Sequence, residues 1–94
     1  MGSDAAGPLV TVVYTAACHL CEDAKAALDD LAGRYQLRVN LVDAATAEGA
    51  ALVRQHRAAM FPLVLIDGEF FSSGRLPRGK LSRLLDAGVT ASSR

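Results

Sequence analysis

A short uncharged strand that leads directly into a cysteine pair at the start of a helix is the feature that most constrains the fold of this chain. Residues 9–14 are β-branched, aliphatic or aromatic, which is typical of a strand covered on both faces. From Cys18 and Cys21 onward, apolar residues recur at three- and four-residue spacing as far as Tyr35, which predicts an amphipathic helix. Gly33 indicates where that helix ends. Both cysteines are therefore expected at the junction between the strand and the helix.

The rest of the chain predicts three further strands and two further helices. Strands are expected at 37–42, 63–67 and 69–72, and helices at 46–57 and from Pro77 to near Gly88. In the second strand, the apolar residues 37, 39 and 41 alternate with polar ones, so one face is expected to be wetter than the other. Asp67-Gly68 is a strong signal for a two-residue hairpin turn. The order strand, helix, strand, helix, hairpin, helix predicts an α/β fold with a four-stranded mixed sheet flanked by helices.

Length and composition point to one domain without a nucleic-acid or membrane partner. The 94 residues fit a single domain at 9–88, with a C-terminal tail at 89–94 and a disordered tail or cloning remnant at 1–8. Ten Lys and Arg balance ten Asp and Glu, and apolar stretches stay far below the roughly 20 residues of a membrane helix. Residues 1–8 lack the basic and apolar regions of a secretory signal, so a cytoplasmic location is expected.

The spacing of the cysteines favours redox or metal chemistry over a purely structural disulfide. The loop between Cys18 and Cys21 is so short that bridging it removes little entropy from the unfolded chain. A cysteine at a helix N-terminus meets unpaired N–H groups and the positive end of the helix dipole, which lower thiol pKa values from about 8.5 into the range of roughly 3.5 to 7.5. Cys18 is therefore the predicted nucleophile and Cys21 the resolving thiol. A protonated His19 would favour the thiolate further, and Leu20 offers apolar contact to a substrate.

A second marker is the Phe61-Pro62 pair directly before the third predicted strand. An aromatic-Pro bond is a candidate for the cis form, and proline is tolerated at the first residue of a strand because it cannot donate a ladder hydrogen bond. Opposite the cysteine pair, such a bond would leave the backbone of Phe61 free to pair with an extended substrate. Tyr14 either lines this site or only packs at the end of its strand.

In these residues the chain resembles the glutaredoxin-like branch of the thioredoxin superfamily. The resemblance extends from about Leu9 to Leu85 and implies that Cys18 attacks, that Cys21 resolves, and that a cis Pro62 lies beside them. It also implies a glutathione site near Phe61, Pro62, Gly74 and Arg75, with Arg78 as a further candidate cation. The chain departs from the family at His19-Leu20, where Pro-Tyr is common, at Thr15, where a basic residue is common, and at residues 73–77, where only Gly74 matches a Gly-Gly-x-x-Asp segment.

The leading hypothesis is a monomeric thiol-disulfide oxidoreductase that transfers electrons to protein or low-molecular-weight disulfides. No bound cofactor or metal is expected, and glutathione, another small thiol or a flavoprotein reductase would serve as reductant. The alternatives are a redox-inactive binding or adaptor module with the same fold and a glutathione-bridged iron-sulfur carrier. Inert core thiols remain a further reading, as does a zinc site, for which His19 and His56 are the only other soft ligands.

Overall fold

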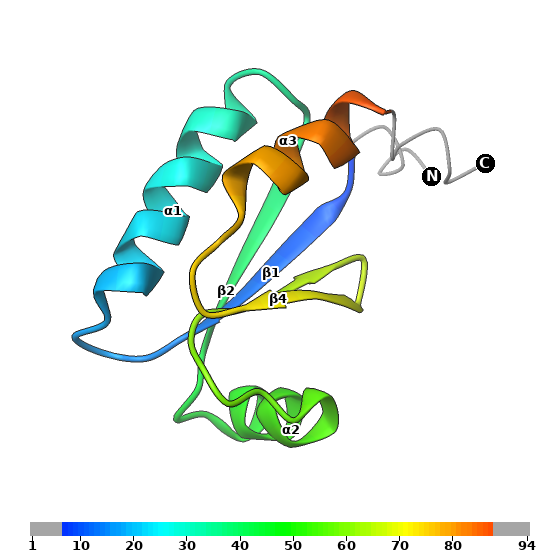
Figure 1. The fold of residues 1–94 in the computed structure, drawn as a ribbon. Coiled ribbons are helices and arrows are strands. Elements are labelled where there is room, and N and C mark those ends of the chain that lie inside the picture. Colours follow the sequence, from blue (N-terminus) through cyan, green and yellow to red (C-terminus); the bar gives the residue numbers. More distant parts are fainter. Residues whose placement is uncertain (1–6, 88–94) are drawn as a thin grey trace.

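The computed structural model describes residues 7–87 and has the predicted order of elements (Figure 1). The strands are β1 (Leu9–Tyr14), β2 (Arg38–Asp43), β3 (Leu63–Ile66) and β4 (Glu69–Ser73), and the helices are α1 (His19–Ala32), α2 (Ala47–His56) and α3 (Arg78–Asp86). Helices α1 and α3 cover one face of the sheet, and α2 lies on the other. Of the tails predicted at 1–8 and 89–94, residues 1–6 and 89–94 lie outside the described residues. No described helix is long and apolar enough to cross a membrane.

The sheet is mixed, with the strand order β2-β1-β3-β4. Strand β1 runs parallel to β2 and antiparallel to β3, with Tyr14 opposite Asp43 and Val13 opposite Leu63. Pro62 directly precedes Leu63, so it lies at the end of the sheet where β1 ends at Tyr14. The end of β1, the end of β2 and the start of β3 therefore meet at one edge of the sheet, where the chain continues into the cysteine pair.

The two faces of the sheet bury separate halves of the core. Under α1 and α3, the packed residues include Val10, Val12, Ala24, Leu28, Val64, Ile66, Leu81 and Leu85. Under α2, they are Val13, Val42, Leu63 and Leu65, with Leu52, Val53 and Phe61 packed against them. The alternation of side chains along β1 thus sends its valines to both halves, which explains why this strand has no polar face.

The β3–β4 hairpin has the turn that its sequence predicts. Asp67 and Gly68 both adopt positive φ, at 51° and 85°, as a two-residue type I′ turn requires. The Asp67 carboxylate also accepts a hydrogen bond of 3.0 Å from the backbone N–H of Leu9. This bond ties the turn to the first residue of β1 and holds β3 in register with it.

Strand β2 differs from the sequence-based expectation. Alternation predicted that residues 37, 39 and 41 would be buried, yet Val39 and Leu41 are exposed and Val42 is buried. The physical reason is that β2 is an edge strand: Val42 packs under α2, whereas Val39 and Leu41 lie on the opposite face at the margin of the α1 layer. Of residues 37, 39 and 41, it is Leu37, just before the strand, that packs against the core under α1 and α3.

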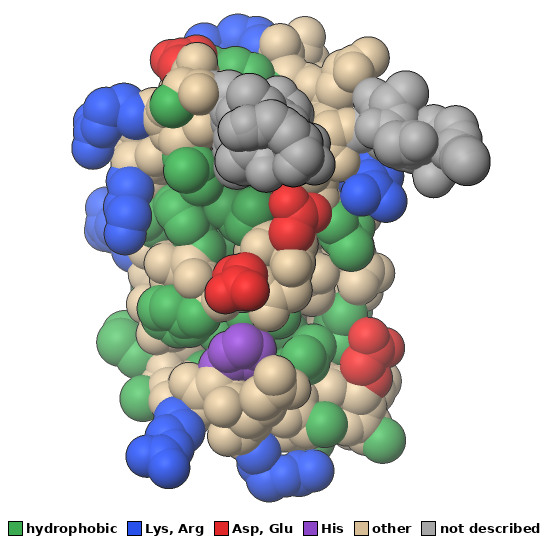
Figure 2. All heavy atoms as spheres, turned by 90° about the vertical axis from the view of Figure 1, so that its right-hand side faces the viewer, with side chains coloured by type: hydrophobic (Ala, Val, Ile, Leu, Met, Phe, Trp, Pro, Cys, Tyr) green, Lys and Arg blue, Asp and Glu red, His purple; other side chains and the backbone are tan. Residues whose placement is uncertain are grey.

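The other edge of the sheet also exposes a hydrophobic residue, Phe70 of β4. Figure 2 looks onto the hairpin end of the molecule and shows hydrophobic side chains near the middle of this face, with Lys and Arg at its rim.

Gly7 and Pro8, which the sequence assigned to an N-terminal tail, are hydrogen-bonded to Arg38 in the structure. The Pro8 carbonyl accepts from the N–H of Arg38, and the Gly7 carbonyl accepts from the Arg38 side chain, so Gly7 and Pro8 belong to the folded domain.

Candidate active site

The cysteine pair occupies the start of α1. Cys18 is the N-cap residue, with extended backbone angles, and its Sγ accepts a hydrogen bond of 3.1 Å from the N–H of Cys21. The two Cα atoms are 5.2 Å apart, and the sulfur atoms are joined in a disulfide. Ala17, in the turn immediately before Cys18, has a φ of 54° and so lies in the left-handed region. The loop of residues 15–17 thus connects the end of β1 to Cys18 at the N-terminus of α1.

The two cysteines differ in their exposure to solvent. Cys18 is half-buried, whereas Cys21 is only 1% exposed and lies on the buried face of α1. A partner from solution can therefore reach the sulfur of Cys18, while Cys21 is reached mainly through Cys18. His19 is exposed and Leu20 is half-buried beside them.

The helix start supplies a favourable environment for a negative charge on Cys18. The N–H of Cys21 already points at its sulfur, and the positive end of the α1 dipole lies at the same place. In the reduced protein these groups would stabilise the thiolate, which is the form of cysteine that attacks disulfides.

Phe61 and Pro62 directly precede β3. Their peptide bond is cis, and Pro62 is fully buried. The Pro62 carbonyl accepts a hydrogen bond of 3.0 Å from the N–H of Gly74. The half-buried Phe61 packs its side chain into the core half under α2, and within residues 7–87 its backbone N–H and carbonyl have no hydrogen-bond partner. That backbone is available to an extended ligand.

Gly74 and Arg75 lie on the other side of Pro62. Gly74 is buried with a φ of 91°, and a Cβ placed on it would lie 3.5 Å from Met60 Sδ. Arg75 is exposed and lines a pocket of about 380 Å³ together with Asp23, Leu76, Pro77 and Arg78. Asp23 comes from the first turns of α1, two residues after Cys21, so this pocket connects the active-site helix to the segment that precedes α3.

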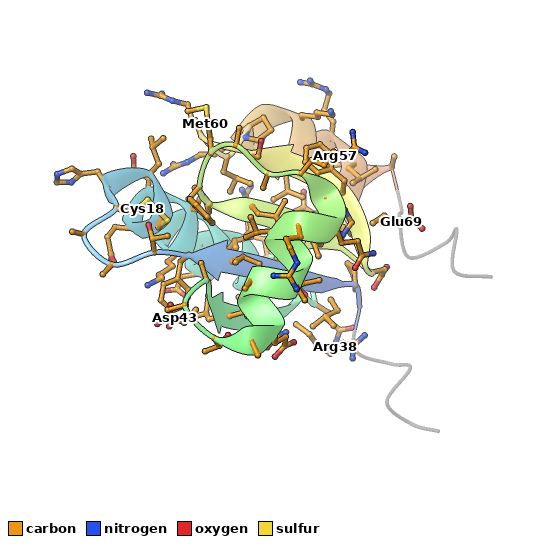
Figure 3. The ribbon with its side chains drawn as sticks, turned by 90° about the horizontal axis from the view of Figure 1, so that it is seen from below. Cys18, Arg38, Asp43, Arg57, Met60 and Glu69 are labelled. Atoms are coloured by element: carbon orange, nitrogen blue, oxygen red, sulfur yellow. A yellow bond between two sulfur atoms is a disulfide. The ribbon has the colours of Figure 1, made fainter. Side chains whose placement is uncertain are left out.

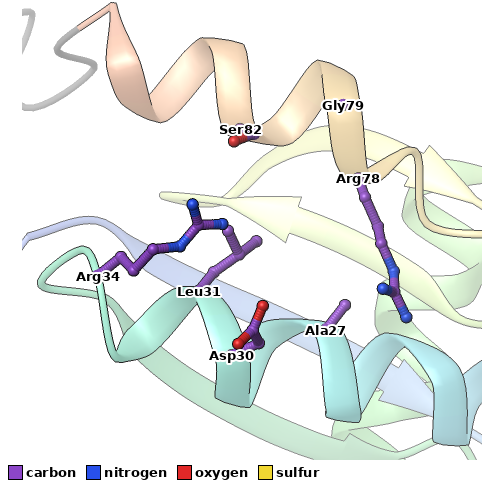
Figure 4. Close-up of a pocket in the computed structure, with 7 residues that line it drawn as sticks. All are labelled: Ala27, Asp30, Leu31, Arg34, Arg78, Gly79 and Ser82. Atoms are coloured by element: carbon purple, nitrogen blue, oxygen red, sulfur yellow. The ribbon is translucent and has the colours of Figure 1, made fainter.

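A second pocket, of about 280 Å³, lies between α1 and α3 (Figure 4). It is lined by Ala27, Asp30, Leu31, Arg34, Arg78, Gly79 and Ser82. Apart from Arg78, none of the residues predicted for the site contributes to it.

Tyr14 is half-buried at the end of β1, and its ring contacts Lys25, a residue that the sequence did not single out. Lys25 of α1 places its Nζ 4.4 Å from the centroid of the Tyr14 ring and 3.5 Å from Glu22 Oε2. The sequence signal that could have found it is the position of Lys25 four residues after Cys21, on the same side of the helix.

Met60 was also missed. It is an exposed hydrophobic residue whose side chain would be in van der Waals contact with a Cβ placed on Gly74, and Figure 3 shows it on the opposite side of the Cys18 end from Asp43. Its place two residues before Pro62 is the only hint in the sequence.

Comparisons with known proteins support the fold and give no closer assignment. A comparison with models of known protein families finds no match, and neither does a comparison with characterised protein sequences. Among solved structures, a mutant thioredoxin from Halobacterium salinarum NRC-1 superposes with a TM-score of 0.66 at 19% identity, over 90% of this chain and 77% of that one. An uncharacterised thioredoxin-like protein from Clostridium perfringens superposes with a TM-score of 0.70 at 12% identity, over 87% of this chain and 71% of that one. With a four-stranded mixed sheet, helices on both faces and a Cys-x-x-Cys pair at the start of α1, this chain has the thioredoxin fold.

Proposed function

We propose that this protein is a thiol-disulfide oxidoreductase of glutaredoxin type that works through Cys18 and Cys21. The observation that carries the proposal is the asymmetry of the pair: Cys18 caps α1 with a reachable sulfur, whereas Cys21 is 1% exposed directly behind it. Inert core thiols would not need one sulfur at a helix N-terminus, and a stabilising disulfide would close a longer loop.

The reaction begins from the reduced pair. The Cys18 thiolate attacks one sulfur of a substrate disulfide, forming a mixed disulfide and releasing the first substrate sulfur as a thiolate, which takes a proton from solvent. Cys21 then loses its proton and attacks Cys18 Sγ, which breaks the mixed disulfide and releases the second substrate thiol. The substrate gains two electrons and two protons, and the protein ends in the disulfide form.

Regeneration reverses these steps with an external reductant. Two small thiols, or a flavoprotein reductase, would return the two electrons, and no resident cofactor is needed. The pocket with Asp23, Arg75 and Arg78 favours a small zwitterionic thiol such as glutathione, because the arginines suit carboxylates and the aspartate suits an ammonium group. The free backbone of Phe61 would pair with the main chain of the same ligand or of a disulfide-containing protein. We propose that the protein acts as a monomer in the cytoplasm.

Intact-mass analysis of the protein equilibrated across glutathione redox buffers tests the proposal. We expect a reversible loss of two hydrogens with a midpoint between about −270 and −120 mV, the range of dithiol oxidoreductases. Reduction of a small disulfide substrate, followed through consumption of the reductant, should show turnover that Cys18→Ser abolishes. A folded protein with no reversible disulfide and no turnover would overturn the proposal and favour a redox-inactive adaptor.

A further inference from the structure

The Lys25 side chain places a positive charge over Tyr14, at the end of the strand that leads into the cysteine pair. We propose that the ammonium group of Lys25, which lies over the ring of Tyr14, stabilises the thiolate of reduced Cys18 electrostatically. The inference rests on the proposed function, because it concerns the reduced form of the same pair.

The geometry places the ammonium group at the first turn of α1. Side chains on a helix lean toward its N-terminus, so the stem of Lys25 runs back over the turn that holds Cys21. Two contacts mark where it ends: Nζ is 4.4 Å from the Tyr14 ring centroid and 3.5 Å from Glu22 Oε2. Glu22 is itself part of this turn, since its N–H donates to the Cys18 carbonyl at 3.1 Å.

Tyr14 fixes the lysine on the side of the nucleophile. It is the last residue of β1, and only the short 15–17 loop separates it from Cys18. A cation over an aromatic ring is attracted by the negative face of that ring. The ring thus favours a position of the charge beside the loop that leads to Cys18.

The carboxylates near Lys25 offset part of its charge. The Lys25 side chain is 30% exposed, whereas its partner Glu22 is 73% exposed, so solvent screens the carboxylate more than the ammonium group. From β2, Asp43 lies opposite Tyr14, but its Oδ1 accepts a hydrogen bond from Ala45 N–H at 2.9 Å. Among the described residues, other charged or titratable groups on this side of the helix start include His19 and Asp23 on α1, and Arg75 and Arg78 before and within α3.

A charge at this place acts on the reduced state alone. The disulfide is neutral, whereas the reduced pair carries a thiolate, so a nearby cation stabilises the reduced form relative to the oxidised one. Stabilisation of the reduced form makes a dithiol more oxidising. Lys25 therefore couples the reactivity of Cys18 to the position of the redox equilibrium.

The test compares Lys25→Met, which keeps the apolar stem and removes the charge, with Lys25→Arg, which keeps the charge. Arg34→Met is the matched control, because it removes one positive charge from over the ring of Tyr35 beyond the opposite end of α1. For each reduced variant, the pH midpoint of thiolate formation is measured by ultraviolet absorbance and by the rate of Cys18 alkylation. The equilibrium constant with oxidised and reduced glutathione is measured on the same samples.

We expect Lys25→Met to raise the pH midpoint by about 0.5 to 1 unit, less than the 1 to 3 units of a close contact pair because Lys25 is partly solvated. The same variant should shift the glutathione equilibrium about 3- to 10-fold toward the disulfide, since one pH unit corresponds to a tenfold change. Lys25→Arg and Arg34→Met should stay close to the unchanged protein.

The outcomes separate this inference from the proposed function. If the unchanged protein cycles between dithiol and disulfide but Lys25→Met has the same midpoint and equilibrium constant, the role of Lys25 is overturned and the oxidoreductase proposal stands. If Arg34→Met produces the same shift as Lys25→Met, the effect comes from the net charge of the protein, and the specific role of Lys25 is again overturned. If the unchanged protein does not cycle at all, the proposed function fails first.

Discussion

The N–H of Gly74 donates a 3.0 Å hydrogen bond to the carbonyl oxygen of Pro62. This bond joins the end of β4 to the residue that precedes β3, at the end of the sheet where β1 leads into the loop before Cys18. The positive φ of 91° at Gly74 directs its N–H toward Pro62, and the exposed Met60 covers the same glycine. A backbone feature of one strand end thereby fixes the segment opposite the cysteine pair.

Gly74→Ala should weaken this connection. A Cβ there has room, since Met60 is 3.5 Å away, but the left-handed backbone is strained for any other residue. We expect the free energy of unfolding to fall by about 1 to 2 kcal/mol, measured by urea denaturation. Gly68→Ala is the matched control for strain at positive φ, because it lies in an open turn far from Pro62. Disulfide turnover should fall with Gly74→Ala and stay unchanged with Gly68→Ala. Equal turnover in both variants would contradict a role of Gly74 in holding the site.

The asymmetry of the cysteines predicts which single substitution traps an intermediate. Cys21→Ser should accumulate a mixed disulfide between Cys18 and glutathione, because no thiol remains to resolve it. Cys18→Ser should accumulate little adduct, since Cys21 is 1% exposed. Intact-mass analysis after incubation with oxidised glutathione measures both. Equal adduct formation on the two variants would show that burial does not assign the roles.

The pocket beside the helix start predicts separate effects on affinity and on chemistry. Arg75→Met and Arg78→Met should each raise KM for a glutathione-containing disulfide about 3- to 10-fold, the loss expected of one solvated charge-assisted contact, with little change in kcat. Arg83→Met is the control, because Arg83 lies on α3 outside this pocket. Steady-state kinetics with the same glutathione-containing disulfide gives KM and kcat for the three variants. An unchanged KM in both pocket variants would direct the search for the reductant elsewhere.

The order of elements could be predicted because each element carries its own local pattern. The apolar run of β1, the spacing in α1 and the Asp67-Gly68 turn each depend on residues close in sequence. The burial of β2 could not be predicted, because it depends on how far the α1 layer reaches across an edge strand. Val39 and Leu41 satisfy the alternation rule and are nevertheless exposed.

The same distinction applies to the candidate site. Cys18 at the N-cap and Pro62 directly before β3 follow from local boundaries, which sequence patterns mark. Lys25 over Tyr14 and Met60 against Gly74 are contacts between different elements, and their residue types do not single them out. Such contacts require the register of the sheet and the placement of α1, which no short segment of sequence contains.

Ala17 offers a test of how strictly the loop positions the nucleophile. Its φ of 54° lies in the left-handed region, where a β-branched side chain collides with the backbone and glycine does not. Ala17→Val should lower the free energy of unfolding by about 1 to 2 kcal/mol and slow the alkylation of reduced Cys18, because relief of the strain moves Cys18 away from the N-cap. Ala17→Gly is the matched variant and should be at least as stable as the unchanged protein, with normal alkylation. Urea denaturation and alkylation kinetics on both variants measure the effect. A valine variant that loses stability but alkylates at the normal rate would show that the left-handed turn serves the fold and not the placement of Cys18.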